Sequence, residues 1–244
     1  MSIALAAKYQ PILDEVYKNA SLTAFMDAKT KPVDFGGASA VNVFKTSMVG
    51  LGKYNRASGY PAGDVTGTWE TLTLSKERGR AFSIDRMDDE ESLGEAFGTL
   101  AGEFIRTQVV PELDAYRFST YASWTGITEV ATPAALDNGS KVLAAFDAAM
   151  AQLDADEVPA EGRVCFIETQ CYNYLKGSLT RTLGAQTSAD RRIFELDGVK
   201  VVPVPQARFY KGVTLDDGAT SAAGGFAKTA STGRDINFLL LHTS

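Results

Sequence analysis

Residues 93–124 read LGEAFGTLAGEFIRTQVVPELDAYRFSTYASW, and this stretch decides the architecture of the chain. Its apolar side chains fall largely at three- and four-residue spacings, which is the period of one face of an α-helix. The spacing predicts a helix from Glu91 to Ser123, which at about 1.5 Å per residue would be about 50 Å long. Pro111 should kink or interrupt it, because proline lacks an N–H group and its ring crowds the preceding turn. A helix of this length is typical of a structural spine and is long for an enzyme of this size.

A run of acidic residues precedes this helix: Asp85, Asp88, Asp89, Glu90 and Glu91. Carboxylates at a helix start accept hydrogen bonds from free N–H groups and meet the positive end of the helix dipole. Helix capping is therefore the simpler interpretation. Magnesium and calcium prefer the same oxygen ligands, so a cation site is the alternative. We predict no metal site, no cofactor site and no catalytic site.

Upstream of the acidic run, residues 32–85 are typical of a long β-hairpin. One leg includes Val41–Phe44, and the returning leg runs from Trp69 to Leu74 with period-two alternation. Between the legs lie the breakers Gly50, Gly52, Gly59, Pro61, Gly63 and Gly67. They exclude a helix and favour an extended, flexible loop. A two-stranded ribbon is marginally stable alone, so we expect it to lie on another subunit.

Basic side chains interleave with aromatic ones along this hairpin. The basic residues are Lys45, Lys53, Arg56, Lys76, Arg78 and Arg80, among Tyr54, Tyr60 and Trp69. Such a pattern can contact nucleic acid, but a contact with an acidic face of a neighbouring subunit is favoured because the rest of the chain is acidic. The run Gly50-Leu51-Gly52-Lys53 lacks the spacing of a phosphate-binding loop and reads as a turn.

The two ends of the chain flank a compact lobe. Residues 1–31 hold irregularly spaced apolar residues, which predict an arm that becomes ordered by lying across another part of the structure or another subunit. The lobe alternates helices and strands and is predicted from Lys141–Leu153, Arg163–Ile167, Gln170–Leu179 and Val199–Val204. A flexible stretch, Asp216–Gly233, leads to an apolar strand, Ile236–His242. That strand either docks into an earlier sheet or marks a chain that stops short of its natural end.

Composition excludes several classes of protein. The 244 residues include 30 acidic and 24 basic side chains, a net charge of −6, which argues against a polycation built to bind nucleic acid tightly. No apolar run approaches the roughly 20 residues of a membrane span. The N-terminus has no basic segment before its apolar residues, so we expect synthesis in the cytoplasm without a secretory signal.

The residues that most often carry catalysis are scarce. Cys165 and Cys171 fit neither a redox nor a zinc spacing, and they read as reduced residues near a core. The only histidine, His242, reads as a strand-end residue, which removes most histidine-dependent catalytic schemes.

Two stretches carry a resemblance to a known family. Residues 80–88 read RAFSIDRMD, and residues 110–117, within the predicted spine helix, read VPELDAYR. Together with the order of the predicted parts, they resemble major capsid (coat) proteins of tailed bacteriophages of the Hong Kong 97 type. The resemblance covers nearly the whole chain. Members of this group continue past a strand like Ile236–His242, so the resemblance implies a shortened chain.

The resemblance implies an α+β fold of the Hong Kong 97 type in five parts. They are an N-terminal arm (1–40), an extended β-hairpin loop (41–85), a peripheral domain with the spine helix (86–135), an α/β axial domain (136–225) and a return strand to the peripheral domain (226–244).

The implied function is structural. The chain would be a non-enzymatic virion subunit that self-assembles into pentamers and hexamers and then into an icosahedral shell around double-stranded DNA, made in the bacterial host cytoplasm. Its partners would be copies of itself, with a scaffold protein, a maturation protease and a portal as further candidates. DNA would be held without sequence-specific contact, and no membrane partner is expected.

The predicted subunit interface lies on the hairpin, because aromatic and arginine side chains dominate such contacts. Its residues are Tyr54, Arg56, Tyr60, Pro61, Trp69, Arg78 and Arg80. Two alternatives stay open. One is an encapsulin-like nanocompartment shell, which would house a cargo enzyme. The other is a soluble enzyme that uses the carboxylates of residues 85–91.

Overall fold

The computed structural model describes residues 16–17, 20–27, 33–35, 40–82, 95–129, 135–178, 192–219 and 224–243. The chain forms two compact units. The smaller one is Ala28–Asp85, and the larger one joins Met1–Asp27 to Arg86–Ser244. We call the smaller unit the ribbon unit and the larger one the body.

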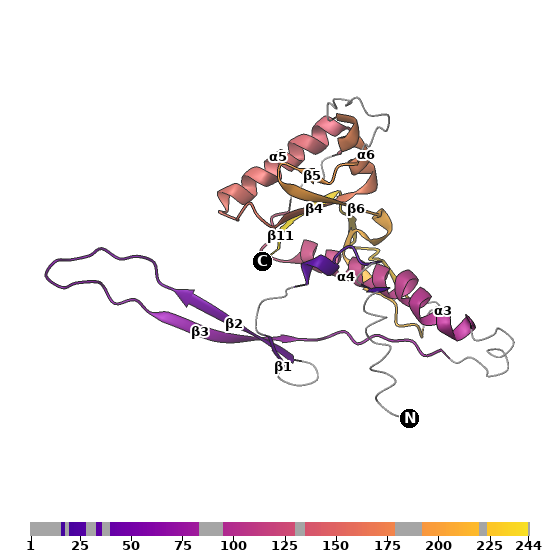
Figure 1. Cartoon of the computed structure of the whole chain (residues 1–244), viewed down its shortest axis with the longest axis horizontal. Coiled ribbons are helices and arrows are strands. Elements are labelled where there is room, and N and C mark those ends of the chain that lie inside the picture. Colours follow the sequence, from indigo (N-terminus) through magenta and orange to yellow (C-terminus); the bar gives the residue numbers. More distant parts are fainter. Residues whose placement is uncertain are drawn as a thin grey trace. The chain divides into compact units, whose positions relative to one another are not determined.

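The body is built on a four-stranded mixed sheet with the order β11-β4-β6-β5 (Figure 1). Strand β4 (Arg163–Glu168) lies parallel to β6 (Val199–Val204) and antiparallel to β11 (Phe238–His242). The short β5 (Glu195–Leu196) pairs with the other side of β6. The predicted strands are therefore present. The last predicted strand, β11, pairs with β4, so it docks into an earlier sheet, which was the first of the two alternatives for it.

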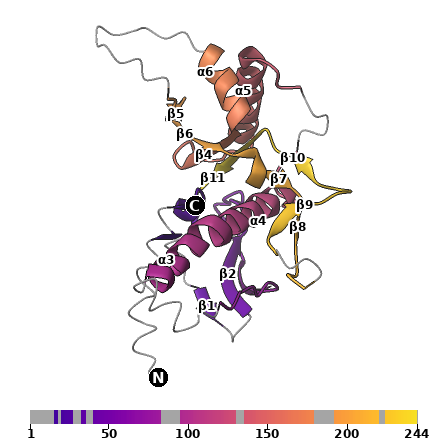
Figure 2. The same cartoon turned by 90° about the vertical axis from the view of Figure 1, so that its right-hand side faces the viewer.

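Helices cover both faces of this sheet. Helices α5 (Gly139–Ala155) and α6 (Thr169–Ser178) lie on one face, and α4 (Val110–Ser123) lies on the other (Figures 1 and 2). Alternation along β4 explains the arrangement, because successive side chains of a strand point to opposite faces. Cys165 and Ile167 belong to the core under α5 and α6, whereas Val164 and Phe166 belong to the core under α4.

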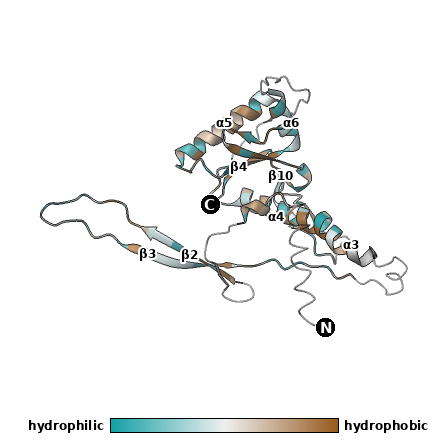
Figure 3. Ribbon diagram, viewed as in Figure 1, coloured by the Kyte–Doolittle hydropathy of each residue, from teal (hydrophilic) through white to brown (hydrophobic). Residues whose placement is uncertain are grey.

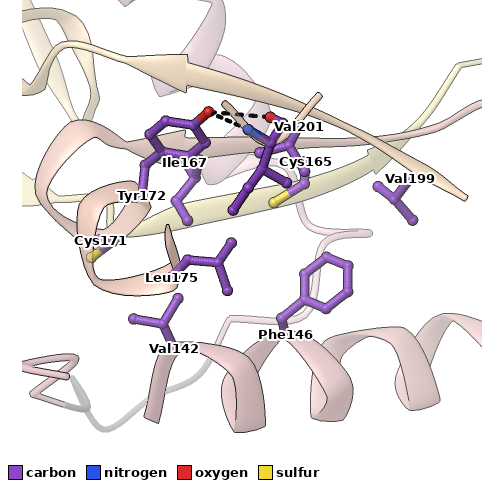
Figure 4. Close-up of a cluster of buried hydrophobic side chains, with 10 residues drawn as sticks. Val142, Phe146, Cys165, Ile167, Cys171, Tyr172, Leu175, Val199 and Val201 are labelled. Carbon is purple, nitrogen blue, oxygen red and sulfur yellow. Dashed lines mark hydrogen bonds between the residues drawn. The ribbon is translucent and has the colours of Figure 1, made fainter. Parts of the chain in front are cut away.

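The core under α5 and α6 is closed by Tyr172 (Figure 4). Its hydroxyl group accepts a hydrogen bond from the backbone N–H of Ile193 at 2.8 Å and lies 3.3 Å from the carbonyl oxygen of the same residue. Each helix also has a local start signal. The Asn138 side chain accepts from the N–H of Lys141, and the Glu168 carboxylate accepts from the N–H of Cys171.

The spine helix is continuous across Pro111. It consists of α3 (Glu95–Phe104), a π-helical turn labelled η2 (Ile105–Val109) and α4. The N–H of Val110 donates to the carbonyl oxygen of Ile105, five residues back. Pro111 cannot donate and crowds the preceding turn, and a wider turn placed just before it relieves the crowding. The expected interruption is thus a π turn rather than a break.

The C-terminal part of the body holds small strands beside the spine. After η3 (Gln206–Arg208), β7 (Tyr210–Lys211) pairs with β10 (Arg234–Asp235), and β8 (Val213–Leu215) pairs with β9 (Phe226–Lys228). The flexible stretch predicted for Asp216–Gly233 is therefore wrong where β9 lies. Its alanine, glycine and threonine residues suggested mobility, but pairing with β8 supplies the backbone hydrogen bonds.

The five predicted parts divide differently from the two compact units. Spine residue Phe118 packs edge-on against Phe166 of β4 and Phe209, with ring centroids 5.0 Å apart in both pairs. The segments predicted as peripheral and axial domains therefore share one core. The last segment (226–244), predicted to return to the peripheral domain, places β11 in the sheet of the predicted axial domain. These functional boundaries remain predictions.

The ribbon unit is a three-stranded antiparallel sheet with the order β1-β2-β3 (Figure 1). Strands β2 (Ala40–Met48) and β3 (Val65–Thr73) form the long hairpin, and β1 (Val33–Phe35) pairs with the start of β2. Residues 33–35 of the predicted arm therefore belong with the ribbon. Before β1, η1 (Ala24–Met26) is part of the body.

Candidate assembly interface

The β2–β3 hairpin has two distinct faces, because its strands pair in a fixed register that sets Phe44 opposite Trp69 and Lys45 opposite Thr68. We call the first the aromatic face; it comprises Ala40, Asn42, Phe44, Thr46, Met48, Val65, Gly67, Trp69, Thr71 and Thr73. We call the second the charged face; it comprises Val41, Val43, Lys45, Ser47, Thr66, Thr68, Glu70 and Leu72.

The aromatic face carries no charge, and its large apolar side chains are exposed. Phe44 and Trp69 form a tilted ring pair with centroids 5.1 Å apart, and Trp69 remains 59% exposed. Met48 is 74% exposed. The Phe44 ring lies over Gly67, where an added Cβ atom would come within 2.6 Å of it, so glycine permits this close approach. No residue of this face is ionisable.

The polar groups on the two faces differ. On the aromatic face, the Thr71 hydroxyl donates to the Asn42 side-chain oxygen at 2.8 Å. On the charged face, Lys45 forms an ion pair with Glu70, and both side chains are largely exposed. The first pair is neutral and internally bonded, whereas the second gains most of its solvation from water.

The tip of the hairpin contains an ordered turn within the loop predicted to be flexible. Asn55 and Gly59 exchange two backbone hydrogen bonds, and Gly59 adopts a φ of +77° that glycine tolerates. This turn sets Tyr54 beside Tyr60, with ring centroids 5.0 Å apart, and Tyr60 is 86% exposed. The two rings thus form a second aromatic cluster at the tip.

The predicted interface residues therefore fall in three places. Tyr54, Arg56, Tyr60 and Pro61 all lie in the tip loop, residues 49–64. Trp69 lies on the aromatic face, and Arg78 and Arg80 follow β3 in an extended segment. The structure brings the tyrosines together but does not bring Trp69 to them. Sequence reasoning missed Phe44 and Gly67, because the register that joins them to Trp69 cannot be read from spacing alone.

Charge separates the ribbon from the rest of the chain. Residues 40–82 carry six basic and three acidic side chains, a net charge of +3. Since the whole chain carries −6, the remaining residues carry −9. The ribbon is thus basic on an otherwise acidic protein.

A second feature is a buried clamp that holds the N-terminal segment on the spine. Asp114 of α4 is fully buried. One of its carboxylate oxygens accepts from the Ser21 and Thr23 hydroxyl groups at 2.8 and 2.6 Å. The other accepts from the Leu22 N–H at 3.1 Å and from Arg208 at 3.3 Å. We call this cluster the arm clamp.

Arg117 extends the arm clamp to Asp27. It donates to the Thr23 hydroxyl at 3.1 Å and pairs with Asp27 at 2.8 Å. Between these contacts, Phe25 stacks on Phe166 of β4 with centroids 5.9 Å apart. Asp27 is the last residue of the body before the ribbon unit, so the arm clamp fixes the point where the chain leaves the body.

Sequence reasoning expected an arm that lies across another part of the structure, and residues 21–27 do lie on the spine helix and the sheet. It did not find the arm clamp. Asp114 looked like an ordinary helix residue within VPELDAYR. Its side chain is buried by a segment about 90 residues earlier in the chain. Such a tertiary contact leaves no pattern in the sequence around Asp114.

The remaining residues that could carry catalysis or bind a metal either have structural positions or lie outside the described residues. The acidic run of residues 85–91 lies outside the described residues. Within the described ranges, no group of three or more His, Cys, Asp or Glu side chains is placed to hold a metal ion. Both cysteines are free and buried in the core, and burial raises the pKa of Cys165 to about 12 and that of Cys171 to about 11. His242 ends β11, as predicted.

Among the helices that the structure describes, none is long and apolar enough to cross a membrane.

Comparisons with known proteins bear on the fold. No family model and no curated protein matches the chain. It is similar to a solved structure described as the capsid of the cyanophage P-SCSP1u, with a TM-score of 0.51 and 12% identity over 89% of this chain and 74% of that one. A structure from Mycobacterium phage Che8 has a TM-score of 0.49 and 20% identity over 68% of this chain. This chain spans 62% of that Che8 chain. The cyanophage comparison shows that the chain has the mixed helix and sheet fold of a phage capsid protein.

Proposed function

We propose that this chain is a major capsid protein of a tailed bacteriophage, of the Hong Kong 97 type, and that it acts as a structural subunit of the virion without catalysis. The observation that carries the proposal is the ribbon. A two-layered or three-layered domain buries its apolar strands, whereas this chain extends a hairpin with an open aromatic face. Such a face on a phage-capsid fold supports a role in contacts between subunits.

The proposed assembly uses the division of the chain into two compact units. If the ribbon of one copy lies on the body of the next, the contact joins two different surfaces. Repeating such a contact around an axis closes a ring. Rings of five and six copies would then build a closed icosahedral shell. The predicted interface residues Tyr54, Arg56, Tyr60, Pro61, Trp69, Arg78 and Arg80 would contribute from the ribbon.

The size of one ribbon contact indicates why many copies are needed. Strands of nine residues are about 30 Å long, and two of them are about 10 Å wide, so one face offers about 300 Å². A stable pairwise interface needs about 800 Å² per partner. A contact through the strand face alone is therefore weak, and its assembly should depend steeply on concentration.

Double-stranded DNA is the proposed content of the shell. The net charge of −9 outside the ribbon does not favour tight phosphate binding, which suits a container that holds DNA without sequence-specific contact. Scaffold protein, maturation protease and portal are the proposed accessory partners. The proposed location is the virion, after synthesis in the host cytoplasm.

The test is to produce the chain and follow its assembly by light scattering after size-exclusion chromatography, with electron microscopy of the largest species. Rings or shells of repeated capsomers are expected above a threshold concentration. Replacing Trp69 with alanine should raise that threshold while the monomer stays folded. The contents separate the alternatives, since a co-purifying enzyme inside the shell would favour a nanocompartment. A monomer that binds cations tightly would instead favour a carboxylate-dependent enzyme.

A further inference from the structure

We propose that the ribbon docks through its aromatic face onto a second copy of this chain and keeps its charged face toward solvent. This inference rests on the proposed function, in which copies of the chain assemble. It adds which of the two faces is buried and which residues set that choice.

The first argument is the cost of removing each face from water. Burying the aromatic face removes Phe44, Met48, Val65 and Trp69 from solvent and desolvates no charge. Its Asn42–Thr71 hydrogen bond is already made within the ribbon, so burial leaves that donor and acceptor satisfied. Few exposed faces of a sheet combine these properties, because solvent-facing strand positions usually carry polar residues.

The charged face is the poorer candidate. Lys45 and Glu70 pair with each other, and burial would strip both ions of water that their mutual attraction does not fully replace. The apolar residues of this face, Val41, Val43 and Leu72, lie toward the end of the hairpin where β1 pairs with β2. The two faces therefore differ most near Lys45 and Thr46, in the middle of β2.

The sign of the charges selects a second copy as the occupant. The ribbon carries +3 and the rest of the same chain carries −9, so the body of another copy offers the complementary charge. The basic side chains Lys53 and Arg56 belong to the exposed tip loop, which joins the two strands that form the aromatic face. An acidic surface beside an apolar contact would attract them without placing a charge inside it.

Two neighbouring residues give a matched test. Thr46 and Ser47 are adjacent, both exposed and both in β2, but Thr46 lies on the aromatic face opposite Gly67 and Ser47 lies on the charged face opposite Thr66. The variants Thr46→Asp and Ser47→Asp place the same charge in the same strand at similar local cost. We expect Thr46→Asp to raise the threshold concentration for assembly roughly tenfold or more, because it buries an unpaired charge. Ser47→Asp should shift it less than about threefold.

Tryptophan fluorescence gives a readout that does not require complete shells. The chain has two tryptophans, so the variant Trp124→Phe leaves Trp69 as the only one. Trp69 is exposed in the single chain, and its emission should shift to shorter wavelength as the concentration rises and copies associate. Its quenching by acrylamide should fall at the same concentrations.

The outcomes separate the inference from the proposed function. Shells that form while Trp69 emission stays unchanged, or that Ser47→Asp disrupts as strongly as Thr46→Asp, overturn the inference and keep the shell. Small oligomers with the Trp69 shift and without shells support the inference and overturn the shell. A chain that never associates at any concentration overturns both.

Discussion

Strands β4 and β3 show how the same kind of element is used in two ways. In β4, five of the six residues are buried, and the middle of the strand is brown in Figure 3. In β3, all nine residues are exposed, and the ribbon is largely pale in the same figure. Strand β4 pairs with a neighbour on each side, and β3 pairs with β2 on one side. Helices α5 and α6 cover one face of β4, and α4 covers the other.

This contrast teaches where each strand obtains its stability. Burial of a large apolar side chain contributes about 1.5–3 kcal/mol, so β4 is stabilised within its own chain. The ribbon gains backbone hydrogen bonds and ring pairs but buries little apolar surface. Its sequence keeps apolar side chains where water remains, which is consistent with a surface that is completed by another molecule.

The largest expected effect compares an aromatic residue of each strand. Replacing Phe166 with alanine removes a fully buried ring that contacts Phe118 and Phe25, and should lower the free energy of unfolding by about 3–5 kcal/mol. Replacing Trp69 with alanine should change it by about 1 kcal/mol or less in the single chain, because it removes only an exposed cross-strand ring pair with Phe44. Urea unfolding of both variants at concentrations below the assembly threshold measures the difference. Equal losses would show that the ribbon is stabilised in the same way as the core.

The next effect is expected at the arm clamp. Asp114→Asn keeps the shape of the side chain but replaces one acceptor oxygen with a donor group. That group would meet the Leu22 N–H or the Arg208 guanidinium, so we expect a loss of about 1–3 kcal/mol. Asp147→Asn, on the exposed side of α5, is the matched control and should change stability by less than about 0.5 kcal/mol.

Hydrogen exchange of residues 21–27 gives a second measurement for the arm clamp. Their amides should exchange faster in Asp114→Asn than in the original chain, while those of β4 stay protected. Unchanged protection of the segment would mean that the stacking of Phe25 on Phe166, rather than the carboxylate, holds it in place.

Much of the body could be predicted from its sequence, because its elements carry local signals. The apolar run of β4 and the three- and four-residue spacing of the spine reflect burial, which is repeated along each element. The disturbance of the helix at Pro111 was predicted, but its form as a π turn was not. Proline indicates a disturbance in a helix, but whether the helix breaks or widens depends on what the next turns pack against, and here Phe118 holds α4 on the sheet.

The candidate interface could be predicted only in part. Aromatic and basic residues, Trp69 among them, predict that the hairpin is a contact surface, and this stays a prediction. Which residues share a face depends on the register that pairs Phe44 with Trp69. The sequence of neither strand determines that register, because a long loop separates the two strands. The arm clamp depends on contacts across about 90 residues, which no local pattern reports.

A smaller effect is the pH dependence of stability that results from burial of the Cys165 thiol in β4. Burial raises the pKa of the Cys165 thiol from 9.0 to about 12, so the folded chain keeps this proton when the unfolded chain has lost it. Its contribution to stability is complete below pH 9 and is lost as the pH rises toward 12. At pH 10 the loss from Cys165 should be about 1.4 kcal/mol, and Cys165→Ala should remove that part of the pH dependence while the part that Cys171 contributes through its own raised pKa remains.

Thiol labelling extends this prediction to the ribbon. At pH 8, Cys165 should react with a thiol reagent only after urea unfolding, because the thiolate is the reactive form. A cysteine introduced by Thr68→Cys, on the exposed charged face of β3, should react in the folded chain. Mass spectrometry of the labelled peptides distinguishes the two sites. Rapid labelling of Cys165 in the folded chain would contradict the burial of β4.

The smallest expected effect is the coupling between Lys45 and Glu70 on the charged face. Both side chains are exposed, so water and salt screen their attraction, and the coupling should be below about 0.5 kcal/mol. A double-mutant cycle with Lys45→Met and Glu70→Gln, read from assembly threshold and monomer stability, measures it. If this face stays in solvent after docking, the coupling should be equally small in the assembled state. If the face were buried, removing one partner would leave the other ion without water, and the single variants would weaken assembly far more than the double variant. The cycle therefore reports the orientation of the ribbon from the side opposite to Trp69.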